Sequence, residues 1–293
     1  MNQTVAIITP AFKAETTIVT TVQSVLTQTH ADWELWIIAD DGRDYAAFLS
    51  QSGISDSRIH CLSSGGMGRG VCHARNVGLE HIDTPFAAIL DADDRLKPRK
   101  LELALLGLQS HAIVTTALDV MSESFAHLRH VGHGVDLVLT PGEHKWINLS
   151  MDSMVVWDRR KADGRYDPAM LNMNDLEFLL QLYRTVPASL HLGTPLHDYI
   201  KRTSSLSNGG DVAQRMIASK SEILRRLQTG CYGLPTEQVD GLAAFLTISL
   251  DAEALYGPAL AARPGLLFED HLEPMLKTKR PTPGGRPLGD AWR

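Results

Sequence analysis

The sequence predicts an α/β fold built on an open, largely parallel sheet with helices on its faces. Short β-branched or apolar runs alternate with helix-like segments through the first half of the chain. Acidic residues directly follow two of these runs. The 293 residues, 44% hydrophobic and 21% charged, are sufficient for a large buried core. Together these observations favour one large sheet rather than a helical bundle.

Strands and helices are expected to alternate from the N-terminus onward. Ile18, Val22 and Val25 recur at helical spacing between two β-branched runs, and this spacing predicts an amphipathic helix. The expected strands are Thr4–Pro10, Trp33–Ala39, Arg58–Ser63 and Pro85–Leu90, and the expected helices are Glu15–Gln28, Gly70–His81 and Lys100–Leu108.

The second half is expected to combine further sheet strands with a helical C-terminal region. Strand-like pieces and one helix precede a linker-like SSLSNGG segment, beyond which two more helices are expected. The expected strands are Ala112–Val120, Ser153–Trp157 and Pro195–Ile200; the expected helices are Asp175–Arg184, one starting near Val212 and one from Pro235 to about Tyr256; and the linker is Ser204–Gly210. The tail Lys277–Arg293, with three prolines, three glycines and five basic residues, is expected to be loosely ordered or ordered by a partner.

Composition excludes several classes of partner and location. A net charge of -6 and a pI of about 6.0 provide no overall basic field, so nucleic acid is not an expected partner. The three cysteines lack C-x-x-C spacing, which favours a reducing cytoplasm. The N-terminal segment does not read as a signal peptide, and the apolar run Gly241–Leu250 is shorter than the roughly 20 residues of a membrane helix. Contact with the inner membrane surface stays compatible with the sequence.

The segment AAILDADDRLKP places Asp91, Asp93 and Asp94 at the end of an apolar strand. Asp40 and Asp41 end an earlier strand, and ligands of open α/β sheets bind beyond such strand ends. Carboxylates suit Mg²⁺ or Mn²⁺ carrying a diphosphate. Two other interpretations of this acidic segment are a solvated turn and the active site of a phosphatase of the haloacid dehalogenase type. The phosphatase motif D-x-D-x-[TV] does not match, because its last position is Arg95.

The glycine-rich Ser63–Val71 has neither a G-x-G-x-x-G register nor a G-K-[ST] ending, so it predicts no dinucleotide site and no P-loop. We interpret it as a loop that turns sharply before the helix carrying Arg75. No G-x-S-x-G nucleophile elbow and no H-E-x-x-H pair occur in the chain.

Six segments, in order, resemble those of family 2 glycosyltransferases of the GT-A fold, and they span about the first 205 residues. They are ITPAFKAE (Ile8–Glu15), SVLTQT (Ser24–Thr29), WELWIIADDGRD (Trp33–Asp44), GVCHARNVGLE (Gly70–Glu80), ILDADDRLKP (Ile89–Pro98) and GRYDPAMLNMNDLEFLLQLYR (Gly164–Arg184). The resemblance implies a Rossmann-like open mixed sheet flanked by helices. It divides the chain into a donor half over residues 1–120, an acceptor half over 121–207 and a helical extension over 208–293.

The resemblance also implies contacts to a nucleotide-sugar donor. Pro10 and Phe12 would lie beside the nucleotide base, and Asp41 would hydrogen-bond a uracil ring. Arg75 would neutralise a donor phosphate or a base edge, and Asp91 would bind the ribose.

Two carboxylates would carry the chemistry that the resemblance implies. Asp93 would bind Mn²⁺ or Mg²⁺, and this metal would assist departure of the diphosphate. Asp175 would act as the general base on the acceptor hydroxyl in an inverting transfer. From the residues alone, an ordinary carboxylate at a helix N-terminus is the favoured interpretation of Asp175, and the family pattern shifts the balance to catalysis.

The chain departs from the family pattern at four sites. Asn174 stands where glutamate is usual, Lys13 where asparagine is common and Arg43 where serine is usual. The motif near the end of the acceptor half appears as YIKRTSSLS, with Arg202 near the expected histidine. Arginine does not ligate a metal, but it can contact phosphate.

The expected activity is therefore inverting transfer of a sugar from a nucleotide-diphosphate donor, best a UDP-sugar, to a carbohydrate or glycoconjugate acceptor. A catalytically silent nucleotide-sugar-binding homologue is one alternative. A sugar nucleotidyltransferase is another, but the first strand lacks its glycine- and arginine-rich loop. The basic tail is expected to close over the site or to contact an anionic acceptor or membrane surface; packing on the body or on a homodimer partner is the alternative.

Overall fold

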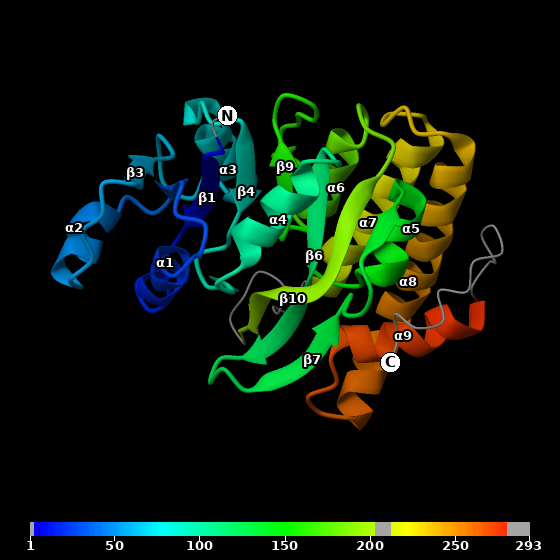
Figure 1. The fold of residues 1–293 in the computed structure, drawn as a ribbon. Coiled ribbons are helices and arrows are strands. Elements are labelled where there is room, and N and C mark those ends of the chain that lie inside the picture. Colours follow the sequence, from blue (N-terminus) through cyan, green and yellow to red (C-terminus); the bar gives the residue numbers. More distant parts are fainter. Residues whose placement is uncertain (1–2, 203–211, 280–293) are drawn as a thin grey trace.

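The computed structural model describes residues 3–202 and 212–279. In these segments ten strands form one twisted sheet in the order β3-β2-β1-β4-β9-β6-β10-β5, with β7 paired to β6 and β8 paired to β10 (Figure 1). The strands are β1 (Val5–Ala11), β2 (Trp33–Ala39), β3 (Ile59–Ser63), β4 (Phe86–Ile89), β5 (Arg95–Leu96), β6 (Ile113–Ser122), β7 (His127–Val131), β8 (Leu137–Leu139), β9 (Val156–Asp158) and β10 (Ser189–Lys201).

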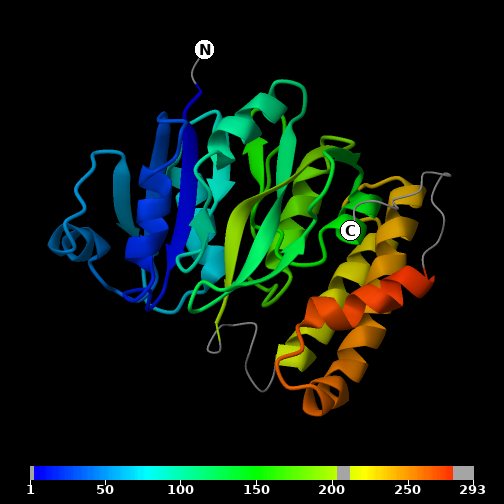
Figure 2. The same ribbon diagram turned by 60° about the horizontal axis from the view of Figure 1, so that its bottom comes forward.

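Helices cover both faces of the sheet, and the alternation of strand side chains divides the core between them. Val5 and Ile7 of β1 belong to one apolar cluster, whereas Ala6 and Ile8 belong to the other. α1 and α4 pack in the first cluster; α3, α6 and the C-terminal helices pack in the second (Figures 1 and 2). The helices are α1 (Ile18–Leu26), α2 (Tyr45–Gln51), α3 (Val71–His81), α4 (Lys100–Leu108), α5 (Pro141–Ile147), α6 (Asn174–Leu182), α7 (Val212–Gln228), α8 (Thr236–Ala262) and α9 (Phe268–Lys279).

The predicted α/β class is confirmed, and the sheet is an open mixed sheet flanked by helices, as expected. β1, β2, β3 and β4 run parallel to one another, whereas β9 lies antiparallel between β4 and β6. Ala11 pairs with Ala39, and the backbone amide of Leu90 donates to the carbonyl of Ile8. The carboxyl ends of β1, β2 and β4 therefore meet at one edge, as the acidic strand ends predicted.

Several elements were not expected from the sequence. α2 begins after Asp44, whose carboxylate caps the helix by accepting from the amide of Ala47 at 2.9 Å. α5 begins after Thr140 with a capping box formed with Glu143. β7 and β8 were missed because their side chains are mostly exposed and show little apolar alternation.

Other boundaries differ from the prediction. β10 starts at Ser189 rather than Pro195, and α8 continues to Ala262 rather than Tyr256. The expected loose tail begins within a helix, because α9 extends to Lys279. The predicted linker Ser204–Gly210 lies outside the described residues, and so does the tail from Arg280 onward. The linker contains Ser205 and Ser207 of the YIKRTSSLS motif.

The C-terminal helices pack directly on the sheet domain. The indole N–H of Trp146 in α5 donates to the carbonyl of Gly241 in α8 at 3.0 Å. A Cβ atom on Gly241 would lie 2.9 Å from the carbonyl oxygen of Gly142, so this close crossing of α5 and α8 requires glycine. Leu242, Phe245 and Leu246 share one apolar cluster with residues of β1 and α6.

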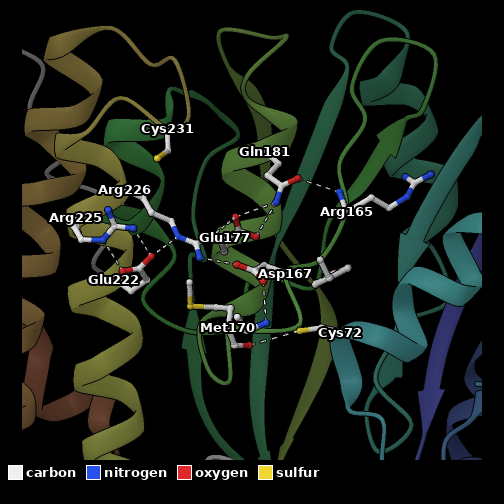
Figure 3. A network of polar contacts seen from close by, with 12 residues as sticks. Cys72, Arg165, Asp167, Met170, Glu177, Gln181, Glu222, Arg225, Arg226 and Cys231 are labelled. Carbon is white, nitrogen blue, oxygen red and sulfur yellow. Dashed lines mark hydrogen bonds and ion pairs between the residues drawn. The ribbon is translucent and has the colours of Figure 1, made fainter. Parts of the chain in front are cut away.

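Arg226 of α7 extends this interface with ion pairs (Figure 3). It donates to Asp167 at 2.6 Å, to Glu177 of α6 at 3.3 Å and to Glu222 of its own helix at 2.8 Å. The neighbouring Arg225 pairs with Glu222 alone in this view (Figure 3).

Across the described ranges, none of the helices combines the length and apolarity needed to cross a membrane.

Candidate active site

The loop after β2 holds Asp41 in a fixed orientation. Its carboxylate accepts from the backbone amides of Lys13 at 2.6 Å and Arg43 at 3.1 Å and from the Tyr45 hydroxyl at 3.0 Å. Burial raises the pKa of Asp41, but these hydrogen bonds outweigh burial and lower the pKa below its ordinary value. Asp41 is therefore an ionised acceptor beside the end of β1.

The neighbouring residues of β1 leave an aromatic surface exposed. Pro10 is the sixth residue of β1, and Phe12 directly follows the strand with 52% of its surface exposed. The Lys13 ammonium lies 5.2 Å from the centre of the Phe12 ring. Lys13 adopts φ +52°, a left-handed conformation that asparagine tolerates better than lysine.

Asp40 organises the glycine-rich loop. Its carboxylate accepts from the amides of Arg69 at 3.0 Å and Gly70 at 2.8 Å and from the Ser64 hydroxyl at 2.6 Å. The loop turns through Gly68 and Gly70, both with positive φ, directly before α3. The interpretation of this segment as a sharp turn before the Arg75 helix is confirmed.

Arg75 joins two of the predicted site carboxylates. One guanidinium nitrogen donates to Asp91 at 2.6 Å, and another contacts both Asp175 and the side-chain oxygen of Asn174, the latter at 2.9 Å. The Arg75 side chain is only 2% exposed. Burial lowers its pKa, but the charges of Asp175 and Asp91 outweigh burial and hold the pKa well above its ordinary value. Arg75 is therefore a buried, permanently charged link between β4 and α6.

Aromatic rings support this arginine from one side. The Arg75 guanidinium carbon lies 4.9 Å from the centre of the Tyr166 ring, and Tyr166 stacks on Phe178 of α6 with ring centres 4.3 Å apart. The packing restricts the directions in which the guanidinium can turn. Asp91 and Asp175 are thus held at a separation set by one rigid group.

The other two acids after β4 have different environments. Asp94 is buried, accepts from the amide of Ile200 at 2.8 Å and lies 3.3 Å from His197, so it ties the turn to β10. Burial and the neighbouring charge of Asp91 hold the pKa of Asp94 well above its ordinary value. Asp94 is therefore a structural acid that holds this turn against β10.

Asp93 remains partly exposed between these neighbours. Burial raises its pKa most, the charges of Asp94 and Asp91 raise it further, and the charge of Arg202 lowers it, leaving the pKa at about 7. The structure thus brings Asp93, Asp91 and Arg202 within electrostatic reach of one another. A cation beside Asp93 would offset the repulsion that raises this pKa.

Asp175 is the second residue of α6, and its side chain is 23% exposed. Burial raises its pKa, the positive charge of Arg75 lowers it, and Asp91 and Asp152 raise it, with the result that the pKa is about 6. The residue before α6, Met173, has φ +56°, so the backbone turns through an unusual conformation two residues ahead of the acid. A carboxylate with this pKa is ionised at neutral pH and is still basic enough to accept a proton.

The sequence did not indicate the supporting roles of three residues of this site. Asn174 was noted only as a departure from the family pattern, yet its amide oxygen accepts from Arg75. Asp40 and Tyr166 hold the glycine loop and the arginine, respectively. Asp40 directly precedes Asp41, and this adjacency was the one signal that could have indicated its role.

Comparisons with known proteins indicate the family to which the chain belongs. A family model described as "Glycosyl transferase family 2" matches residues 6–164. The Escherichia coli UDP-Glc:alpha-D-GlcNAc-diphosphoundecaprenol beta-1,3-glucosyltransferase WfgD is 41% identical over 101 residues, which are 34% of this chain and 39% of the E. coli protein. TuaG of Bacillus subtilis (strain 168), a glycosyltransferase named for teichuronic acid biosynthesis, is 29% identical over 208 residues, 70% of this chain and 81% of TuaG.

Solved structures match the fold over nearly the whole chain. TarS residues 1–349 from S. aureus, in complex with UDP-GlcNAc, superimposes with a TM-score of 0.64 and 13% identity. The match covers 94% of this chain and 80% of the TarS chain. The large mixed sheet with helices on both faces is thus the GT-A fold. Because the family model covers more than half of the 293 residues, the chain belongs to glycosyl transferase family 2 and is a glycosyltransferase that uses a nucleotide-sugar donor.

Proposed function

We propose that this enzyme transfers a sugar from a UDP-linked donor to an acceptor hydroxyl with inversion at the anomeric carbon. One observation carries the proposal: a single buried arginine, Arg75, contacts both Asp91 and Asp175. An inverting transfer needs a base on one face of the sugar and charge stabilisation of the diphosphate on the other. The diphosphate side would be formed by Asp91 and Asp93 at the end of β4. The base on the other face would be Asp175 at the start of α6.

Asp175 is the proposed general base. Its pKa of about 6 leaves it ionised at neutral pH, and its side chain is partly open to solvent, so an acceptor hydroxyl can reach it. Arg75 occupies one carboxylate oxygen and orients the other. Here Arg75 is a positioning residue as well as the donor-site arginine that the sequence predicts.

Asp93 is the proposed ligand of Mn²⁺ or Mg²⁺. Hard divalent cations prefer carboxylate oxygens, and the donor set after β4 fits this preference. Burial raises the pKa of Asp93 most and the charges of Asp94 and Asp91 raise it further, so a bound cation would stabilise its ionised form. The metal would supply Lewis-acid stabilisation of the departing diphosphate. Arg202, whose charge acts on Asp93, is the proposed additional phosphate contact.

A uracil nucleotide is the proposed base of the donor. The ionised Asp41 can accept a hydrogen bond from the ring N–H of uracil, and the exposed Phe12 beside Pro10 offers an apolar surface. The printed names of WfgD and of the TarS complex contain UDP-Glc and UDP-GlcNAc, and these names support the choice of UDP. Asp91 is the proposed ribose contact.

The acceptor is proposed to be a carbohydrate or glycoconjugate. The names of WfgD and TuaG refer to a diphosphoundecaprenol-linked sugar and to teichuronic acid, and such acceptors would place the enzyme at the inner membrane surface. The basic tail from Arg280 onward remains the proposed membrane or acceptor contact, and a homodimer remains a prediction. The three cysteines are free, which supports the proposed cytoplasmic location.

A donor screen tests the proposal. We expect UDP and a UDP-sugar to raise the melting temperature more in Mn²⁺ than in EDTA, and GDP to have little effect. Wild-type enzyme should hydrolyse or transfer the matching donor, whereas Asp175→Asn should bind it and turn it over slowly. Equal, negligible rates for both proteins would leave only a nucleotide-sugar-binding homologue. Failure of every nucleotide to shift the melting temperature would overturn the UDP proposal.

A further inference from the structure

A second group of metal-binding side chains lies on the β6–β7 hairpin, outside the carboxylates described above. Asp119 of β6 and His127 and His130 of β7 bring one ligand atom each to within 4.8 Å of one another. The Asp119 side chain is 9% exposed, whereas His127 and His130 are 42% and 49% exposed. A small ion can therefore reach the group from solvent while the carboxylate stays fixed in the sheet.

A β-bulge puts the two histidines on the same face of the hairpin. Residues three positions apart in a regular strand point to opposite faces. Here Val120 pairs with Arg129 and Met121 pairs with His127, so β7 carries one extra residue between the pairs. Asp119 pairs directly with His130. The bulge thus converts an H-x-x-H spacing into two side chains beside one carboxylate.

Two of the three separations between the ligand atoms fit a tetrahedral ion. Nε2 of His127 lies 3.2 Å from Oδ1 of Asp119 and 3.3 Å from Nδ1 of His130. Ligands bound to tetrahedral zinc at its usual bond lengths are about 3.3 Å apart. Ligands of octahedral magnesium are closer, at about 2.9 Å. Nδ1 of His130 also contacts Oδ1 of Asp119 directly, and a bound ion would replace that hydrogen bond.

The remaining carboxylate oxygen of Asp119 is already held. Oδ2 contacts the ammonium of Lys97, which also lies 3.6 Å from Asp198 of the adjacent strand β10. Such a hydrogen bond fixes the orientation of a metal-ligating carboxylate. It also offsets part of the negative charge, so we expect weaker binding than at a site of four cysteine thiolates.

We propose that Asp119, His127 and His130 form a second metal site, specific for a borderline transition-metal ion such as Zn²⁺. Two imidazoles and one carboxylate select zinc or a similar ion over Mg²⁺, which prefers oxygen ligands only. Water would complete the tetrahedron on the exposed side. The inference is independent of the proposed sugar donor and of the metal at Asp93.

The position of the site indicates a structural role. Between the two histidines, Arg129 pairs with Asp270 and, at 2.9 Å, with Glu273 of α9. An ion at the site would cross-link β6 to β7 and thereby fix the hairpin that contacts the C-terminal helices. Zinc binding should therefore raise thermal stability without changing the donor specificity of the enzyme.

Metal titrations of the full chain test the proposal. Chelator-stripped protein, kept in excess Mg²⁺ to occupy the oxygen-only carboxylates, is titrated with Zn²⁺ by calorimetry and with Co²⁺ by visible absorption. Wild-type protein should bind one equivalent and show the intense absorption of tetrahedral Co²⁺. The double variant His127→Gln/His130→Gln should bind about tenfold or more weakly and lose that absorption.

Three controls separate this site from the rest of the molecule. Asp93→Asn should retain the Co²⁺ spectrum, and so should His111→Gln, which changes a histidine outside the group. Circular dichroism checks that the double variant is folded. An unchanged zinc affinity in the double variant, or loss of the Co²⁺ spectrum in Asp93→Asn, would overturn the proposal.

Discussion

Arg75 and Asp175 are 100 positions apart in the sequence, yet their side chains form a direct ion pair between α3 and the start of α6. The same guanidinium also binds Asp91 at the end of β4. The proposed base and the proposed ribose ligand are therefore fixed relative to each other by one side chain. The arrangement links the donor side of the enzyme to the acceptor side.

Replacing Arg75 by lysine should impair both activity and stability. Lysine carries a single ammonium group and cannot hold two carboxylates in the fork geometry of arginine. We expect Arg75→Lys to lower kcat by roughly 10- to 100-fold and the free energy of unfolding by about 1–3 kcal/mol. Urea denaturation and steady-state kinetics measure these effects. Arg165→Lys, at a side chain 47% exposed that binds the exposed Asp163, is the matched control and should change little. Wild-type kinetics in Arg75→Lys would refute the positioning role.

Removing the proposed base should affect turnover more than binding. Asp175→Asn keeps the size of the side chain but cannot accept the proton of the acceptor hydroxyl. We expect kcat to fall by about 10²- to 10⁴-fold while the Kd for UDP changes less than about threefold. Rapid-quench kinetics and calorimetry with UDP make the comparison. A loss of UDP affinity equal to the loss of rate would indicate a donor ligand instead.

The rate should depend on pH through the same carboxylate. Asp175 must be ionised to act as a base, and burial helps to place its pKa at about 6. With metal and donor saturating, kcat/KM for the acceptor should therefore fall about tenfold per pH unit below about pH 6 and be level above it. The residual kcat/KM of Asp175→Asn should not show this fall at acidic pH. A wild-type profile that stays level down to about pH 5 would contradict the assignment.

In metal-free protein, Asp93→Asn should be stabilising at alkaline pH. Burial and the charges of Asp94 and Asp91 raise the folded-state pKa of Asp93 to about 7, above its unfolded value. The wild-type stability from this group is thus present at acidic pH and lost as pH rises through about 7. We expect Asp93→Asn to add about 1–3 kcal/mol at about pH 8, with the gain shrinking toward about pH 4.

Calorimetric unfolding in EDTA gives the comparison for Asp93. Asp163→Asn, at a carboxylate 65% exposed, should shift stability by less than about 0.5 kcal/mol at either pH. Added Mn²⁺ should stabilise wild-type protein more than Asp93→Asn. A gain from Asp93→Asn that is equal at both pH values would show that the charge of Asp93 is not its source.

Arg226 should contribute more to stability than the adjacent Arg225. Arg226 is 19% exposed and binds Asp167 and Glu177 across the interface, whereas Arg225 is 60% exposed and pairs with Glu222 on its own helix. We expect Arg226→Ala to cost about 1–3 kcal/mol and Arg225→Ala less than about 0.5 kcal/mol. Chemical denaturation measures the free energy of unfolding of both variants. An equal loss in the two would mean that the ion pairs across the interface contribute little to stability.

The parallel strands of the sheet could be predicted from the sequence. So could the edge of the sheet at which the acidic residues after these strands lie together. Continuous apolar runs such as β1 and β4 specify buried strands, and parallel strands bring their carboxyl ends together. The predicted strand Ser153–Trp157 overlaps β9, but its antiparallel direction could not be predicted, because a three-residue strand carries no directional signal. The contact of Asp94 with the amide of Ile200 joins residues 106 positions apart, and only the tertiary fold reveals it.

Local backbone geometry was the other source of missed features. The bulge in β7 depends on pairing with β6, so the H-x-x-H spacing alone gave no indication that both histidines share a face. The left-handed Lys13 likewise has no residue signal, because lysine rarely adopts that conformation. At the β7 bulge and at Lys13, the tertiary structure imposes a backbone conformation that the residue types do not predict.

The close crossing of Gly142 and Gly241 has a consequence for engineering. Since α5 and α8 bury one continuous apolar cluster with β1 and α6, a chain truncated before α7 would expose that cluster to solvent. Chimeras that exchange acceptor preference should therefore carry α7–α9 along with the sheet domain that they were built on. Fusion partners belong beyond α9, where an added segment would not separate two helices that touch through glycine.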